Sequence, residues 1–211
     1  VMAVLMKHFE DSRTEAERQA ELEFAARSAD FDAESPFQVG ADEMDVILSK
    51  VQLSRLIRFA YSDDVEEQHQ AARSLTNLSV NVVNQPRIVA AGGLILLNKL
   101  ANSPYAAVQF QSLRALANLA SHEDNKLPMC EGEILQTLMD VGSEGNVAVK
   151  RQVARAMANM ASHESTKVKM VEKGVAGPLI SCSYCHIVEV QRQASRAFAS
   201  LSRDPDNQMP L

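Results

Sequence analysis

The chain has 211 residues, of which 46% are hydrophobic and 5% aromatic, with no Trp and a formal net charge of −6 at pH 7. This acidic balance argues against a binder of nucleic acid or anionic membranes, which needs a stripe of Lys and Arg. No apolar run approaches the ~18–20 residues of a membrane span, so direct membrane insertion is not expected. Three cysteines form no disulfide framework, so we expect a reducing, cytoplasmic location, with cytoskeletal association or the nucleus left open.

Residues 1–30 look like an eroded copy of a repeat that is clear further along the chain. Phe24, for example, matches Phe198 of the last copy. We interpret 1–30 as a degenerate N-terminal repeat that keeps two helices. Residues 31–42, which contain a proline and a glycine, are then a loop insertion.

From residue 43 the chain is an array with a period of 41 residues. Each copy predicts a short first helix, such as Glu43–Lys50, and a second helix with apolar residues at helical spacing, such as Leu53–Tyr61. The second helices of the later copies are expected at Leu94–Asn102, Ile134–Gly142 and Val175–Cys182. The array 43–211 therefore divides into repeats near 43–83, 84–124, 125–165 and 166–206, with the start of a further helix to 211.

The third helix of each copy carries the clearest repeated string. It reads QAARSLTNLS at 70–79, QSLRALANLA at 111–120, QVARAMANMA at 152–161 and QASRAFASLS at 193–202. A fixed period of about 40 residues is the signature of a stacked repeat array. One such unit cannot bury its own apolar stripe, so neighbouring units must stack into a continuous core.

At about 100° per residue, this third helix has two faces. Ala71, Leu75 and Leu78 share the face that we expect to be buried. The roughly opposite face carries polar residues at equivalent positions: Gln70, Arg73 and Asn77; Gln111, Arg114 and Asn118; Gln152, Arg155 and Asn159; and Gln193, Arg196 and Ser200. Stacking at constant pitch brings them into one row.

Each unit has three helices, the short first helix ends at glycine, as at 88–93 and 170–175, and the third helix closes with Leu-x-Asn-Leu-Ser. In these three features the array resembles the armadillo repeat. The resemblance implies an all-α, right-handed superhelical solenoid whose third helices line a concave groove. It also implies that asparagines at positions 77, 118 and 159 hold the backbone of an extended peptide.

The sequence departs from importin-like members of this family. Those arrays carry Trp one turn before the asparagine, where this chain has Arg73, Arg114, Arg155 and Arg196. Arg offers a planar fork of donors for carboxylate or phosphate. The row therefore predicts an extended partner segment that is acidic or phosphorylated. The alternative is a structural ladder, in which the row only satisfies polar groups of the neighbouring repeat.

Two patterns could suggest other chemistry. The residues Cys182, Cys185 and His186 spell a haem-attachment or metal-binding pattern, but the period places Cys182 in a core position and Cys185 in a turn. Ser-His-Glu at 121–123 and 162–164 occurs twice at one repeat position, unlike a catalytic triad. We predict no catalytic residues, no metal and no cofactor.

The sequence thus predicts a non-catalytic protein–protein interaction scaffold or adaptor. The alternative is a structural subunit of a cytoskeletal or ciliary assembly that docks through its convex face, its loops or its ends. A third reading is the adaptor part of a larger enzyme or motor. Because uncapped solenoid ends expose apolar surface, we also expect either a longer array or an assembly that covers the ends.

Overall fold

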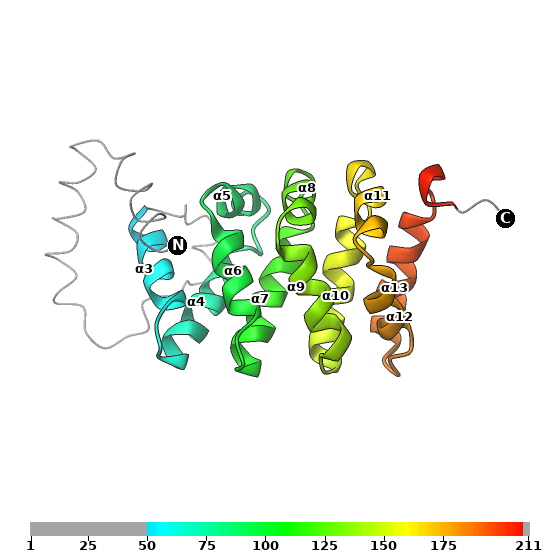
Figure 1. The fold of residues 1–211 in the computed structure, drawn as a ribbon. Helices are drawn as coiled ribbons and strands as arrows, with labels where there is room; N and C mark the ends of the chain where they lie inside the picture. The colour runs from blue at the N-terminus through cyan, green and yellow to red at the C-terminus, as the bar shows by residue number, and fades with distance from the viewer. Residues whose placement is uncertain (1–49, 209–211) are drawn as a thin grey trace, which may run out of the picture.

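The computed structural model describes residues 50–208, and every element assigned there is a helix (Figure 1). Two helices come first, α3 Lys50–Ala60 and α4 Val65–Leu78. Three groups of three follow: α5 Asn84–Ala90, α6 Gly93–Ala101 and α7 Ala106–Leu119; α8 Glu123–Glu131, α9 Ile134–Glu144 and α10 Val147–Met160; α11 Glu164–Glu172, α12 Ala176–Ser183 and α13 Val188–Leu201. A short 3-10 helix, η2 Pro205–Asn207, comes last. The predicted all-α class is confirmed.

The predicted second helices of the last three repeats match α6, α9 and α12 to about one or two residues, which is the usual uncertainty of a helix end. The first copy differs, because α3 begins at Lys50 rather than Leu53. Lys50, which we expected to end a first helix, therefore belongs to the second. The rest of that first helix, the degenerate repeat at 1–30 and the insertion at 31–42 lie outside the described residues.

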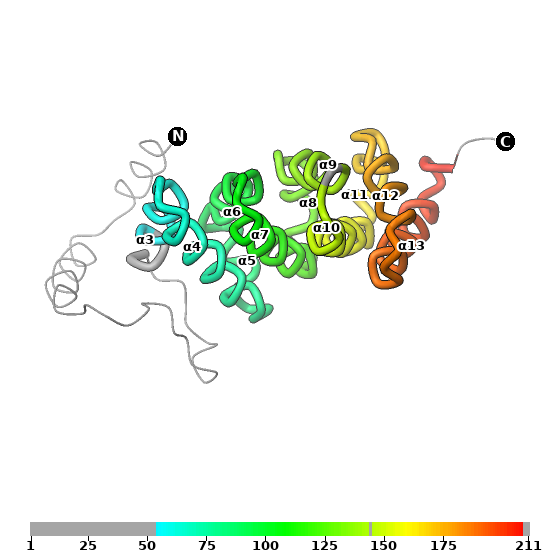
Figure 2. Tube along the Cα trace, turned by 90° about the horizontal axis from the view of Figure 1, so that it is seen from below, coloured from blue at the N-terminus to red at the C-terminus, as the bar shows by residue number. Residues whose placement is uncertain are grey.

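Equivalent helices of successive repeats lie side by side along the molecule (Figure 2). The third helices α4, α7, α10 and α13 pack in that order and make the most extensive contacts between helices. The second helices α6, α9 and α12 form another row, and the first helices α5, α8 and α11 form a third. The fold is therefore an armadillo-type solenoid, in which each repeat packs on its neighbours.

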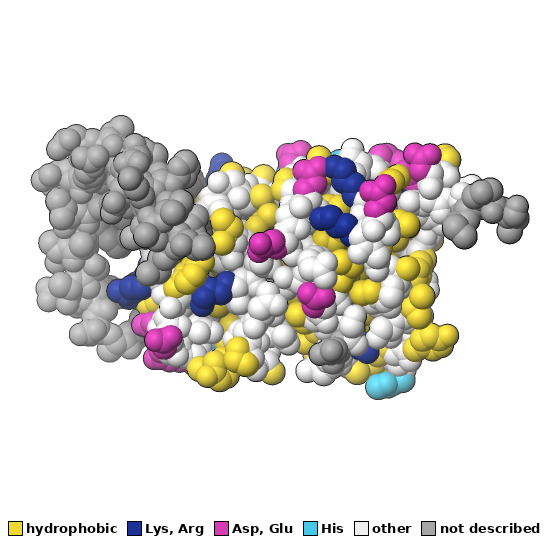
Figure 3. All heavy atoms as spheres, viewed as in Figure 1, with side chains coloured by type: hydrophobic (Ala, Val, Ile, Leu, Met, Phe, Trp, Pro, Cys, Tyr) yellow, Lys and Arg dark blue, Asp and Glu magenta, His cyan; other side chains and the backbone are white. Residues whose placement is uncertain are grey.

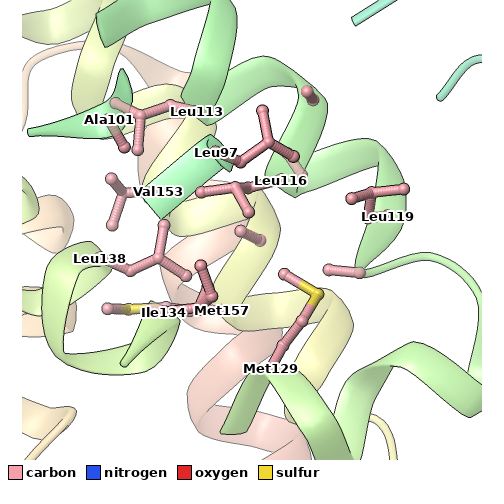
Figure 4. Close-up of a cluster of buried hydrophobic side chains, with 14 of the residues drawn as sticks. Leu97, Ala101, Leu113, Leu116, Leu119, Met129, Ile134, Leu138, Val153 and Met157 are labelled. Atoms are coloured by element: carbon pink, nitrogen blue, oxygen red, sulfur yellow. The ribbon is translucent and has the colours of Figure 1, made fainter. Parts of the chain in front are cut away.

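A continuous apolar core runs between these rows (Figure 4). In the close-up, Leu97 of α6, Leu116 of α7 and Met157 of α10 point toward one another, and all three are almost fully buried. Met157, Met160 and Met170 are each 0% exposed, as expected for methionines that fill core positions. Ala71 and Leu75 are buried as predicted, whereas Leu78, near the end of α4, is only half-buried.

Polar side chains at one repeat position join the third helices α7, α10 and α13 to the helix that follows each. Asn125 Nδ2 donates to Leu119 O at 3.0 Å, Thr166 Oγ1 to Met160 O at 2.5 Å, and Asn207 Nδ2 to Leu201 O at 3.0 Å. Each bond satisfies a carbonyl that the helix end leaves without a partner inside the helix. These bonds tie neighbouring repeats together at three junctions of the array.

Candidate functional site: the third-helix face

The polar residues predicted to form a row lie on α4, α7, α10 and α13, which are the four helices that pack side by side. We call their outward surface the third-helix face. Its side chains are not equally accessible. Arg73, Asn77, Arg114 and Arg196 are exposed; Gln70, Gln111, Arg155, Asn159 and Gln193 are half-buried; and Asn118, Gln152 and Ser200 are buried.

Asn118 is held between two repeats. The Arg155 guanidinium donates from Nη2 to Asn118 Oδ1 at 2.9 Å, and Asn118 Nδ2 donates to Ser79 Oγ at 3.1 Å. The amide thereby connects α7 both to the repeat before it and to the repeat after it.

Asn159 repeats this arrangement one unit later. Arg196 Nη2 donates to Asn159 Oδ1 at 2.5 Å, and Asn159 Nδ2 donates to Ala117 O at 3.1 Å. These two sets of bonds form a ladder of the kind that we considered as the structural alternative. A carboxamide has two lone pairs on oxygen and two N–H donors, so the half-buried Asn159 keeps one acceptor and one donor position for a partner, whereas the Asn118 amide is buried between its neighbours.

The first rung of the ladder is open. Asn77 and Arg114 have the same sequence separation as Asn118 and Arg155, yet among residues 50–208 neither side chain has a hydrogen bond or an ion pair. The same holds for Arg73 within the described residues. At this end the third-helix face therefore presents donors and an amide that are not occupied by the rest of the array.

A depression of about 480 Å³ opens where α7, α10 and α13 meet. It brings together predicted row residues and three others that the sequence reasoning missed. Its lining consists of Phe110, Arg114, Arg151, Gln152, Arg155, Glu189 and Gln193.

Positive charge is concentrated at this depression. Burial lowers the pKa of Arg155, and the neighbouring charges of Arg114 and Arg196 lower it further. Glu189 is the one carboxylate in the lining, and it is already engaged by the guanidinium of Arg192 and by Gln193 Nε2 at 2.8 Å. The site is therefore suited to an anion.

The sequence contained a signal for Arg151. It precedes Arg155 by four residues on one helix, and residues at that spacing share a face. Phe110 and Glu189 carry the same signal, because Phe110 precedes Arg114 by four residues on α7 and Glu189 precedes Gln193 by four on α13. That the three meet at one depression depends on how α7 and α13 pack against α10.

The cysteine pattern lies in the core rather than at a site. Cys182 is 0% exposed within α12, and Cys185 is buried in the link that follows, as the period predicts. His186 is exposed. In residues 50–208, no cluster of three or more His, Cys, Asp or Glu side chains has the arrangement of a metal site.

The two Ser-His-Glu segments begin first helices. His122 Nδ1 accepts from Asp124 N at 3.3 Å, and His163 Nδ1 accepts from Ser165 N at 3.1 Å, so each histidine is a helix N-cap. Acidic and basic side chains lie together over α8 and α11 in Figure 3, where Lys169 pairs with Glu131. The Lys169–Glu131 pair joins the first helices of two successive repeats.

Comparison with known proteins supports the architecture. An engineered protein with a crystal structure is 30% identical, with a TM-score of 0.70 over 77% of this chain and 67% of that one. A designed armadillo repeat protein in complex with the peptide (KR)4 is 24% identical, with a TM-score of 0.69 over 77% and 69%. A computationally designed armadillo repeat protein for modular peptide recognition is 21% identical, with a TM-score of 0.70 over 95% and 82%. The similarity to these last two proteins, at 24% and 21% identity, concerns the fold alone.

Comparison with curated proteins gives no match. No helix within the described residues has the length and hydropathy to cross a membrane. The model of the Armadillo-like family matches residues 45–184, which is well over half of the chain. The chain therefore belongs to the Armadillo-like family.

Proposed function

We propose that the protein is a non-catalytic scaffold that binds an extended segment of a partner protein along the third-helix face. The armadillo repeat fold is generally a protein-binding scaffold, and designed members recognise peptides. The observation that carries the proposal is the open first rung, where Arg73, Asn77 and Arg114 are exposed and have no hydrogen bond or ion pair among residues 50–208.

The chemistry of the row favours an acidic or phosphorylated segment. The exposed Asn77 and the half-buried Asn159 keep a donor and an acceptor that match a peptide C=O and N–H, independently of the side chains bound. The arginines add positive charge along the same face, although the chain as a whole has a net charge of −6. The designed armadillo repeat protein described above binds the basic peptide (KR)4. Because this face carries arginines instead, we expect it to prefer a segment of the opposite charge.

A selection from a library of linear peptides, followed by affinity measurements with variants, tests this proposal. The Arg73→Ala/Asn77→Ala/Arg114→Ala variant removes groups without partners in the described structure, so it should melt like wild type. We expect selected peptides to bind it at least about tenfold more weakly, since a hydrogen bond to a charged group is worth roughly 1.5–3 kcal/mol. Undiminished binding by this variant would refute the proposal.

A second candidate is docking of the array into an assembly through a loop. Three valines in the link between α4 and α5 favour it, because Val80, Val82 and Val83 are 51%, 60% and 58% exposed. A photo-crosslinking residue placed at position 82 or at position 114 in cells separates the two candidates. Crosslinks to a partner from position 82 but not from 114 would favour loop docking.

A further inference from the structure

The depression between α7, α10 and α13 adjoins the open first rung and shares Arg114 with it. It is lined by three arginines, Arg114, Arg151 and Arg155, and by the single carboxylate of Glu189. Its volume of about 480 Å³ lies within the roughly 300–1,000 Å³ of ordinary ligand pockets. A bulky anionic side chain and the backbone next to it would therefore fit.

The three guanidinium groups are poorly compensated. Arg114 and Arg151 have no hydrogen bond or ion pair within the described part of the chain, and Arg155 has one bond, to the neutral Asn118 amide. The Glu189 carboxylate is bound by Arg192 and Gln193. Most of the guanidinium N–H donors in the depression are thus free for an anion.

Gln152 supplies an independent observation. The residue is 5% exposed, it lines the depression, and its Oε1 has no hydrogen-bond partner. A buried acceptor without a donor costs about 1–3 kcal/mol. A fully ionised phosphate or sulfate has no N–H to offer it, whereas a bound peptide does.

We propose that this depression binds the phosphorylated side chain of a serine or threonine in the partner segment. Phosphate presents three acceptor oxygens and close to two negative charges, which matches three guanidinium groups better than a carboxylate does. A backbone N–H of the same segment is placed to satisfy Gln152. This inference rests on the proposed function and specifies which residue the segment must carry.

The test uses three peptide pools with identical random flanks and a central phosphoserine, serine or glutamate. Fluorescence anisotropy at one salt concentration gives the affinity of the wild-type protein for each pool. We expect the phosphoserine pool to bind about tenfold or more tightly than the serine pool, with the glutamate pool between them. Equal affinities for the phosphoserine and serine pools would overturn the inference.

Two variants test whether the preference for the phosphoserine pool over the serine pool comes from the depression. Arg114→Gln and Arg151→Gln remove guanidinium groups that have no partner among residues 50–208, and each should reduce the preference about tenfold. Arg87→Gln on α5 is the matched control, because Arg87 is exposed, outside the depression, and carries the same charge. A preference that survives Arg151→Gln would also overturn the inference.

Inorganic phosphate as a competitor separates a segment-borne phosphate from the free ion. We expect it to displace the phosphoserine pool only at concentrations far above the pool's dissociation constant. If inorganic phosphate bound as tightly as the pool, the depression would be a small-anion site and the inference would be wrong. If all three pools bind equally well, yet the Arg73/Asn77/Arg114 variant binds none, the scaffold function stands and only the phosphate specificity fails.

Discussion

At the residue scale, two glycines adopt the left-handed backbone conformation, which the sequence does not show directly. Gly92 and Gly174, at the junctions of first and second helices, have φ values of +81° and +87°. In both positions an added Cβ would meet no atom within 4 Å, so the cost of a side chain there is conformational.

We expect Gly92→Ala to lower the free energy of unfolding by about 1–2 kcal/mol, because L residues are strained in the left-handed region. Gly177→Ala is the matched control. Gly177 lies in the first turn of α12 without a positive φ and also has no atom within 4 Å of an added Cβ, so Ala should cost less there than at Gly92, although Pro178 opposes part of the gain in helix propensity. Urea denaturation measures both. Equal effects of the two substitutions would contradict this account.

Cys182 gives a second prediction at this scale. Burial raises the pKa of its thiol to about 11 from an ordinary value of 9.0, so at slightly alkaline pH the thiolate fraction falls about 100-fold. Iodoacetamide should therefore leave Cys182 unmodified in the folded protein and modify it in urea, as mass spectrometry would show. Rapid modification in the folded state would indicate that Cys182 is accessible.

At the element scale, the ladder between third helices predicts a specific coupling. In a double-mutant cycle, Asn118→Ala and Arg155→Ala should show a coupling energy of about 0.5–1.5 kcal/mol, because each removes the other's partner. Asn77→Ala and Arg114→Ala form the matched control, since they occupy equivalent positions without a bond. Coupling in the control pair, or its absence at Asn118 and Arg155, would contradict the observed ladder.

The start of α8 predicts a pH dependence. The pKa of Glu123 lies below its ordinary value of 4.5, first because the Lys126 ammonium donates to its carboxylate, and then because Lys126, His163 and His122 are nearby. A carboxyl group whose pKa is lower in the folded than in the unfolded protein stabilises the folded state at pH values above its unfolded pKa. This stabilisation is lost as the pH falls through the folded pKa. Wild type should therefore lose its stability advantage over Glu123→Gln below pH 4.5.

Urea titrations at neutral pH and at several pH values below 4.5 measure this difference. Glu172→Gln serves as the control, because Glu172 has no hydrogen bond or ion pair in residues 50–208. A difference in stability between wild type and Glu123→Gln that does not change with pH would contradict the lowered pKa of Glu123.

The helices themselves were largely predictable from the sequence. The 41-residue period aligned the copies, so a clear copy such as 111–120 fixed the helix phase of weaker ones. A residue's position in the row did not determine its exposure to solvent. Asn77 and Asn118 occupy equivalent positions, yet Asn77 is exposed and Asn118 is buried. Asn118 is buried by contacts from both neighbouring repeats, including Ser79 and Arg155. Such contacts depend on the packing between units, which the period alone does not specify.

At the scale of the whole molecule, the row has two parts. Over α7, α10 and α13 the arginines and asparagines hold successive repeats together and surround the cationic depression. Toward α4 the equivalent groups have no partner among the described residues. The structural ladder therefore accounts for Asn118, Arg155, Asn159 and Arg196, while the binding surface that we propose comprises the open groups toward α4 and the depression.

The crystal structure of the protein with a selected phosphoserine peptide would show whether the third-helix face binds the partner segment. We expect an extended segment across α4, α7 and α10, with its backbone amides bonded to Asn77 and its phosphate against Arg114 and Arg151. A peptide bound on the first or second helices, with Asn77 and Arg114 still free, would contradict it.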